Sequence, residues 1–202
     1  MMGGSKNQGF HDSPGEVEGL EDKYGKPREL SLEVEMGDRE FHGLEESISR
    51  GRRQDATLFI LIGDKIAVIQ KHTHAPGIYR APSGTIKPGE SIEECALREA
   101  YEETGLKIRL ERYLVRAKIL FKNRGKSYDW VSHVFLAYKV AGDLNPRDTR
   151  EVKKVRLVTS KELEGEIKEK LLASGSGGLR YRALLTDIAL QEMRKIGYLP
   201  RR

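Results

Sequence analysis

The chain has 202 residues, a net charge of +5 and an isoelectric point near 9.2. This length suits one domain, and 38% hydrophobic residues are enough for a single core. The longest apolar run, residues 57–62, has the length of a strand, and residues 1–19 lack the apolar segment of a signal peptide. The lone Cys95 cannot form an internal disulfide. We therefore expect a cytoplasmic protein with no membrane partner.

The N-terminal quarter of the chain divides into two segments by composition. Residues 1–22 are glycine-rich and polar, which predicts a disordered tail. From residue 30 to residue 36 apolar and polar residues alternate, which predicts a strand. Residues 41–53 are interpreted as the rest of a hairpin or an irregular lead-in. We accordingly expect an N-terminal extension over 23–55, which could serve as a dimer arm, and a main domain over 56–202.

The main domain is predicted to mix strands with helices. The expected strands are residues 56–62 and 65–71 around the turn Gly63-Asp64, a short extended segment at 79–82, and longer strands at 108–121, 130–140 and 152–158. Thr159 and Glu162 form a capping box for a helix through about residue 173, and a closing amphipathic helix is expected over 182–196. This order of elements predicts an α/β sandwich.

A helix that ends at residue 104 carries the most informative pattern. Ser91 with Glu94 forms a capping box at its start, and Gly105 suits a left-handed cap at its end. Three acids, Glu99, Glu102 and Glu103, fall within an arc of roughly 100° on this helix. The neighbouring arc is expected to be buried and contains Ala96, Leu97, Ala100, Tyr101 and Thr104.

Three carboxylates this close repel one another unless a cation lies among them. Oxygen ligands on a rigid helix suit a hard cation such as Mg²⁺. The pattern therefore predicts a site that holds metal ions against a phosphorylated substrate. Arg98 is expected to pair with Glu94 or Glu90. The alternative is an acidic helix end that simply faces solvent.

Residues 84–106, GTIKPGESIEECALREAYEETGL, resemble the Nudix box. The matching positions are Gly84, Glu90, Arg98, Glu99, Ala100, Glu102, Glu103, Gly105 and Leu106, with Ala100 smaller than usual. The resemblance implies a Nudix α/β/α sandwich with a mixed β-sheet, here with an N-terminal strand extension. It also implies that the box forms a loop, a helix and a loop at the edge of the sheet.

The resemblance further implies Mg²⁺-dependent hydrolysis, with Mn²⁺ as a substitute, of the diphosphate linkage in a nucleoside diphosphate derivative. The metal ligands would be Glu99, Glu103, Glu102 and the carbonyl of Gly84. Glu102, Glu103 and Arg98 would take part in catalysis, Arg98 by orienting the glutamates. Some relatives dimerise through an added N-terminal sheet, so a homodimer is expected.

Other candidate residues surround the box. Glu151 and Asp148, before the strand at 152–158, are candidates for the general base, with surface charges as the alternative. His72 and His74 share a strand face and could form a metal pair or end a solvated strand. Arg80 and Tyr79, just before the box, are expected to contact substrate. Phe121, Tyr128 and Trp130 could stack on a base or pack in the core.

The substrate stays open between ADP-ribose, a dinucleotide, a nucleotide sugar and a nucleoside triphosphate. Phe121 stands where ADP-ribose hydrolases of the family tend to carry proline. The basic residues at 109–126 alternate with apolar ones, which indicates a solvated strand face or a rim that attracts polyphosphate. Nucleic acid is not excluded, so hydrolysis of an RNA 5′ end or cap is one alternative, and a non-catalytic binding module is another. An isomerase is disfavoured because the only cysteine lies inside the box helix.

Overall fold

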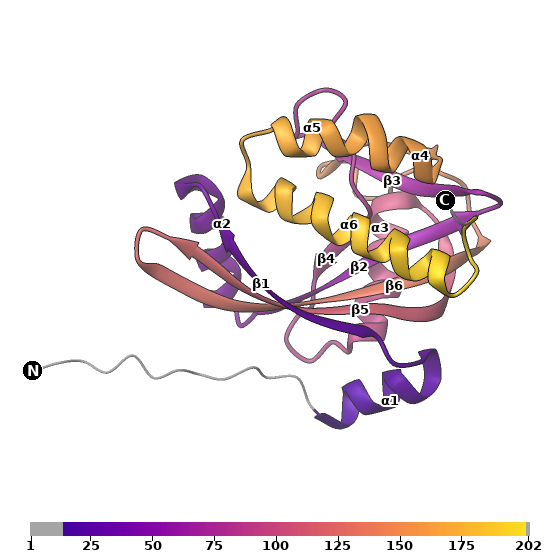
Figure 1. Cartoon of the computed structure of the whole chain (residues 1–202), viewed down its shortest axis with the longest axis horizontal. Helices are drawn as coiled ribbons and strands as arrows, with labels where there is room; N and C mark the ends of the chain where they lie inside the picture. The colour runs from indigo at the N-terminus through magenta and orange to yellow at the C-terminus, as the bar shows by residue number, and fades with distance from the viewer. Residues whose placement is uncertain (1–13, 201–202) are drawn as a thin grey trace, which may run out of the picture.

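A computed structural model describes residues 14–200, which fold around a seven-stranded mixed sheet (Figure 1). The strands run in the order β1-β5-β6-β2-β3-β7, and the short β4 pairs with β2. Their bounds are β1 Arg28–Glu35, β2 Gln54–Ile62, β3 Lys65–Lys71, β4 Ser83–Thr85, β5 Lys107–Asn123, β6 Lys126–Ala141 and β7 Val152–Val158.

Turn residues fix the hairpins of this sheet. Gly63 has a φ of 64° between β2 and β3, and Arg124 and Gly125 have φ values of 46° and 81° between β5 and β6. These positive φ values suit the two-residue turns that match the strand twist. In contrast, β2 lies parallel to β6 and β1 lies parallel to β5. The predicted strands are confirmed, with β5 and β6 longer than expected, except at 79–82. There only Arg80 forms an isolated bridge, to Ile69, and the strand β4 follows at Ser83–Thr85.

Helices cover both faces of the sheet, as an α/β/α sandwich requires. On one face, a core cluster joins the sheet to α2 (Asp38–Ser49), to α6 (Gly177–Lys195), and to a segment made of α4 (Ser160–Glu162), a π-helical turn (Leu163–Ile167) and α5 (Lys168–Ala173). On the other face, α1 (Pro14–Tyr24) and α3 (Ile92–Thr104) pack over a second cluster. Figure 1 shows α1 on the side of the sheet away from α6.

Two predictions for the N-terminal quarter are wrong. Residues 14–22, expected to be disordered, belong to α1, which buries Val17, Leu20 and Tyr24 against the sheet and α3. Residues 41–49, expected as a hairpin or lead-in, belong to α2, which buries Phe41 and Leu44. Residues 1–13 of the expected tail lie outside the described residues. The expected strand near residue 30 is confirmed as β1.

The C-terminal segment follows the prediction with two changes: the first helix is interrupted by the π-helical turn Leu163–Ile167, and the last helix starts earlier. The Thr159 capping box is present, and α6 starts at Gly177, five residues earlier than expected. A Cβ on Gly177 would lie 1.9 Å from the carbonyl oxygen of Glu35, so the start of α6 lies directly against the end of β1. Within residues 14–200, no helix is both long and apolar enough to cross a membrane.

Candidate active site

The helix α3 is held at both ends by the caps that its sequence predicts. The Ser91 hydroxyl accepts from the Glu94 amide, and the Glu94 carboxylate accepts from the Ser91 amide. Gly105 ends the helix with a φ of 80°, and its amide donates to the carbonyl of Tyr101. The position of each acid on α3 is therefore fixed by local sequence.

The buried face of α3 agrees with the predicted one at Ala96, Ala100 and Thr104, which are fully buried, and differs from it elsewhere. Leu97 and Tyr101, expected inside, are about 40% exposed, whereas Glu99 is 8% and Glu103 is 2% exposed. The acidic arc thus turns toward the sheet, where Cys95 and Ala96 are also buried. Two carboxylates inside the protein require compensating charge. Glu99 and Glu103 are therefore not a solvated helix end, whereas the side chain of Glu102 is 41% exposed.

Glu99 lies against the backbone of β4. A Cβ on Gly84 would be 1.9 Å from the carboxylate carbon of Glu99, so only glycine leaves room for this side chain. Burial raises the pKa of Glu99 to about 7, and the negative charge of Glu103 adds to that shift. The loop glycine and the buried acid are thus packed as one unit.

Glu103 lies deeper and meets three donors or cations. Its Oε2 accepts from the amide of Ser83 at 2.7 Å. Its Oε1 lies 3.3 Å from Lys71 Nζ and 3.5 Å from Arg80 Nη2, and this buried oxygen has no hydrogen-bond partner in the described part of the chain. The Glu103 carboxylate is therefore a buried negative charge, and one of its two oxygens is not hydrogen-bonded.

Arg98 connects the acids to the loop before α3. Its Nε donates to Glu90 Oε1 at 2.5 Å, and its Nη1 donates to Glu102 at 2.9 Å and to Glu99. Hydrogen bonds to Glu90 raise the pKa of Arg98, so the guanidinium stays charged. Of the two predicted partners, Glu90 is confirmed, whereas Glu94 serves the helix cap.

The loop that carries the predicted bases is attached to the end of α3. The carbonyl of Glu102 accepts from the amides of Arg147 and Asp148, both at 2.9 Å. The Asp148 carboxylate accepts from the amides of Arg150 and Glu151, so it shapes its own loop. Glu151 instead pairs with Lys71, which also faces Glu103. Of the two candidates, Glu151 is the one linked to the buried acids.

Arg80 and Tyr79, both expected to contact substrate, lie in different surroundings. Arg80 is buried and donates to the carbonyl of Ala81 at 2.7 Å and to Ser83 Oγ at 2.8 Å. Tyr79 packs in the core under the Arg156 guanidinium, 4.6 Å from its ring centre, and does not line the cleft described next. Tyr79 is therefore a core residue and not one that lines the cleft.

The two histidines do not form a pair. His72 Nε2 lies 3.1 Å from the carbonyl oxygen of Thr149, whereas His74 lines the cleft. Burial and the charges of Arg80 and Lys71 lower the pKa of His74 to about 4, so it is neutral at neutral pH.

A cleft of about 980 Å³ brings the site together. Residues from α3, β4 and the 148–151 loop line one part of it, and residues from α2 and the start of α6 line another. The cleft lining includes Arg52, Asp55, Lys71, Arg80, Gly84, Arg98, Glu99, Glu102, Trp130, Asp148, Glu151 and Arg182. Its volume is at the upper end of the usual range for ligand pockets, about 300–1,000 Å³.

Comparison with known proteins identifies the family. The family model of the NUDIX domain matches residues 52–177, which is more than half of the chain. The chain belongs to the Nudix family.

The matched relatives and structures agree with the family. The chain is 31% identical over 86 residues to the NAD-capped RNA hydrolase NudC of Chromobacterium violaceum, covering 43% of this chain and 30% of that protein. The equivalent NudC of Photobacterium profundum is 32% identical over 83 residues, covering 41% and 29%. The chain thus spans about a quarter to a third of the length of the curated relatives it matches.

Solved structures share the fold. A NUDIX hydrolase from Nitrosomonas europaea superposes with a TM-score of 0.53 at 16% identity, over 71% of this chain and 88% of that one. The pyrophosphohydrolase BsRppH of Bacillus subtilis superposes with a TM-score of 0.52 at 21% identity, over 73% and 84%. The predicted Nudix α/β/α sandwich is confirmed.

The donors on the Nudix helix fit a divalent metal. Glu99 and Glu103 offer buried carboxylate oxygens, and the Gly84 backbone lies against Glu99. Among residues 14–200, no three side chains of histidine, cysteine, aspartate or glutamate form a ready-made metal group, because the acids turn to Arg98, Arg80 and Lys71. The unsatisfied Glu103 Oε1 is an oxygen that a hard cation would satisfy.

Sequence reasoning missed several residues of the cleft. Lys71 ends a strand that reads as apolar, and only the pairing of β3 with β7 brings it to Glu151. Arg182 reaches across the cleft from α6 to Asp55, with Nη2 2.7 Å from the carboxylate. These pairs join residues 80 and 127 positions apart. A local sequence pattern therefore carries no signal for these two long-range pairs.

Proposed function

We propose that this Nudix hydrolase binds Mg²⁺, or Mn²⁺ in its place, and cleaves the diphosphate linkage of a nucleoside diphosphate derivative. The observation that carries this proposal is the burial of Glu99, which lines a large cleft, and of Glu103 one turn along α3, whose Oε1 has no hydrogen bond within the described residues. Buried acids gain most from a cation that they share.

Each residue has a proposed task at this site. Glu99, Glu103 and the Gly84 carbonyl hold the metal, with Glu102 beside them. When bound, Mg²⁺ neutralises phosphate charge and lowers the pKa of water. Arg98 positions the glutamates through its hydrogen bonds to Glu90, Glu99 and Glu102.

Two cations and one acid complete the proposed site. Arg80 and Lys71 face the acids from the sheet and meet the negative charge of the substrate. Glu151 accepts the proton of the attacking water, because its carboxylate is tied to the same lysine that faces Glu103. A positioned carboxylate of this kind acts as a general base.

A second candidate function is hydrolysis at an RNA 5′ end or cap. It is supported by the activity for which the NudC relatives are named, hydrolysis of NAD-capped RNA, and by the net charge of +5. Both candidates break a diphosphate linkage at the same glutamates. They differ in whether a polynucleotide follows the linkage.

The test is a hydrolysis screen with a matched pair of variants. ADP-ribose, NAD, a dinucleoside polyphosphate, a nucleotide sugar, nucleoside triphosphates and NAD-capped RNA are incubated with Mg²⁺ or Mn²⁺. We expect Glu103→Gln to lose most turnover on any substrate found, while Glu94→Gln, on the same helix outside the cleft, keeps it. Turnover in Glu103→Gln equal to the wild type would refute the site.

The homodimer remains a prediction. The N-terminal extension docks on its own chain, with β1 paired to β5 and α1 packed on α3, so no exchange of this arm is needed to complete the fold. Light scattering that gave the mass of one chain would exclude the dimer.

A further inference from the structure

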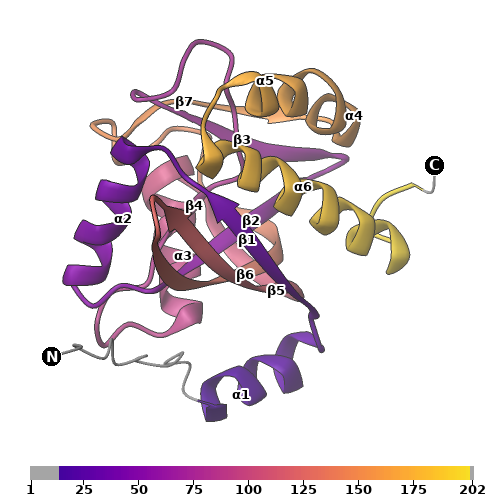
Figure 2. The ribbon, with the colours of Figure 1, turned by 60° about the vertical axis from the view of Figure 1, so that its left-hand side comes forward.

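Lys71 lies between two acids with different proposed tasks, Glu103 as a metal ligand and Glu151 as the base. Alternate residues of β3 face the same side of the sheet, and Ala67 of this strand belongs to the core cluster that packs under α3. Lys71, four residues further along the strand, therefore points to the same side. Figure 2 shows α3 behind the strands and α6 in front of them. The ammonium thus reaches Glu103 from the sheet, and its Nζ lies 3.3 Å from Glu103 Oε1.

An irregularity in the strand pairing brings Glu151 to the same lysine. The register of β3 against β7 shifts just before Lys71, which lies opposite Val152. Such irregularities redirect side chains and are frequent beside functional sites. The amide of His72 donates to the carbonyl of Glu151 at 3.1 Å, which fixes the loop before β7 to the end of β3. The Lys71 ammonium therefore pairs with Glu151 as well.

The two cations beside Glu103 are held in different ways. Arg80 is buried, and its Nη1 donates to two further acceptors at 2.7 Å and 2.8 Å, which fix the guanidinium in place. The side chain of Lys71 is 18% exposed, and its second partner, Glu151, is 51% exposed. A lysine ammonium is a point charge on a flexible stem, so it changes partner more easily than a guanidinium with fixed hydrogen bonds. Of the two cations, Lys71 is the one that can leave Glu103.

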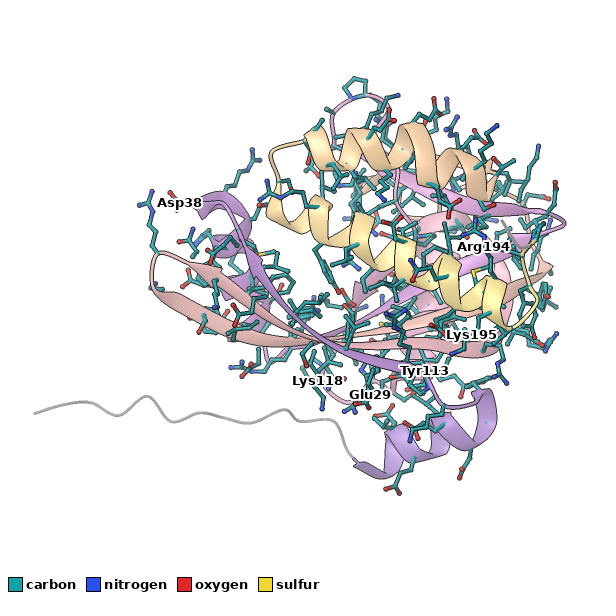
Figure 3. All side chains as sticks on the ribbon, viewed as in Figure 1. Glu29, Asp38, Tyr113, Lys118, Arg194 and Lys195 are labelled. Carbon is teal, nitrogen blue, oxygen red and sulfur yellow. The ribbon has the colours of Figure 1, made fainter. Side chains whose placement is uncertain are left out.

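An ion pair outside the cleft shows the contrast. Arg194, labelled in Figure 3, donates through both terminal nitrogens to the two oxygens of Glu164, at 2.6 Å and 2.7 Å. These side chains are 14% and 15% exposed, and neither lines the cleft. A two-bond pair of this kind fixes both partners. Lys71 instead lines the cleft and divides one ammonium between an interior acid and a more exposed one.

We propose that Lys71 is an internal counter-ion of Glu103 and competes with the divalent cation for that carboxylate. As Glu103 takes up the cation, the ammonium leaves it for Glu151, so the occupancy of the metal site and the surroundings of the proposed base are coupled. The proposal rests on the proposed function, because it takes Glu103 as a metal ligand. It makes Lys71 a positioning residue that sets the metal affinity of the site.

Electrostatics gives the direction of the expected effects. An ammonium and a divalent cation at one carboxylate repel each other, and little water screens them at Glu103, which is 2% exposed. Removal of the Lys71 charge should therefore raise the affinity for the cation. The same removal leaves a buried acid with less compensating charge, so the protein without metal should become less stable.

The experiment measures Mn²⁺ binding by titration calorimetry and thermal unfolding in EDTA, with no substrate present. Lys71→Met keeps an unbranched side chain without the charge, whereas Lys71→Arg keeps the charge. We expect the dissociation constant for Mn²⁺ to fall at least about tenfold in Lys71→Met and to stay within about threefold of the wild type in Lys71→Arg. In EDTA the Tm of Lys71→Met should be lower than that of the wild type. Saturating Mn²⁺ should raise it by more, because tighter binding to the folded state stabilises it more.

Two further variants are matched controls. Lys65→Met removes an exposed cation from the other end of β3. Arg194→Met removes the charge from an ion pair of low exposure outside the cleft. Both should bind Mn²⁺ as the wild type does, although Arg194→Met should also lower the Tm in EDTA. A gain in Mn²⁺ affinity in either control as large as that of Lys71→Met would overturn the assignment to Lys71.

The coupling to Glu151 is tested by a double-mutant cycle. Glu151→Gln should weaken Mn²⁺ binding in the protein that has Lys71, because the ammonium loses the acid that receives it and stays at Glu103. In the Lys71→Met background the same substitution should have little effect. Equal weakening in both backgrounds would show that Glu151 acts on the metal directly and would overturn the coupling.

The outcomes separate this inference from the proposed function, because no hydrolysis is measured. Lys71→Met that binds Mn²⁺ no more tightly than the wild type would overturn the inference, even where the wild type hydrolyses a substrate. Tighter Mn²⁺ binding by Lys71→Met, in a protein that hydrolyses nothing in the screen, would keep the inference and refute the proposed reaction. Circular dichroism of each variant checks that the fold is kept.

Discussion

The carboxylate of Glu16 accepts a hydrogen bond of 2.6 Å from the amide of Ile92, the first residue of the Nudix helix. Two turns further along α1, Lys23 and Tyr24 donate to Glu93 at 2.8 Å and 2.6 Å. The helix that carries the acids is thus held at its start by a segment that the family model does not match. Negative charge at a helix start also suits the helix dipole.

Glu16→Ala should therefore lower the stability of the whole protein. Loss of a helix cap costs about 1 kcal/mol, which corresponds to a drop of about 2–4 °C in Tm for a chain of this size. The control is Glu18→Ala, at an exposed position on the same helix. Equal Tm changes in the two variants, measured by calorimetry, would contradict the capping role.

Gly84→Ala should disable the site while the fold survives. The added methyl would occupy the place of the Glu99 carboxylate, 1.9 Å from its carbon, and so displace that ligand. A shift of about 1 Å in a reacting group can reduce turnover about a hundredfold. Gly19→Ala should behave as the wild type, since a Cβ there meets nothing. Steady-state rates and circular dichroism measure the two effects, and normal turnover in Gly84→Ala would count against Glu99.

Glu40→Ala should loosen α2 from α6. The variant leaves the Gly177 and Gly178 amides and the start of α2 without their acceptor. Hydrogen bonds to a charged group each contribute about 1.5–3 kcal/mol, so a loss of at least about 2 kcal/mol is expected in denaturant unfolding. Glu46→Ala changes an exposed acid on the same helix and should cost far less. Similar losses of unfolding free energy from Glu40→Ala and Glu46→Ala would show that the hydrogen bonds between Glu40 and the start of α6 do not stabilise the protein.

Glu151→Gln should lower kcat more than it changes KM. A general base contributes about 10²–10⁴-fold, so its removal should lower kcat by a factor in that range. Asp148→Asn is the informative comparison, because asparagine can still accept from the loop amides that Asp148 serves. A larger fall in kcat for the Asp148 variant than for the Glu151 variant would show that Glu151 is not the base.

The sequence predicted the Nudix helix well because its determinants are local. Ser91, Glu94 and Gly105 act within one turn of the ends that they define. The spacing of Phe41, Leu44 and Ile48 in α2 was also a helical signal, and it was overlooked because an extension was expected to be strand. The burial of the acidic arc could not be predicted, since it depends on β4 and on lysine and arginine residues from the sheet.

Most of the cleft residues could not be predicted from the sequence for the same reason. Arg182 and Asp55 meet across 127 positions, and Lys71 and Glu151 meet across 80. Tyr79 lies next to Arg80 in sequence but faces the core, because neighbours on an extended segment point to opposite sides. The role of a single residue can be predicted from sequence only where the backbone conformation around that residue is already known.

The parallel pairing of β1 with β5 has a consequence for how the chain is made. Glu29 of β1 bonds to Arg116 of β5, 87 positions later. A ribosome that adds about 5–20 residues per second needs several seconds to reach that partner, and until then β1 has no neighbour. Pairing over such a distance is also slow to form. The emerging N-terminal segment is therefore the part of this protein most exposed to chaperones and to misassembly during synthesis.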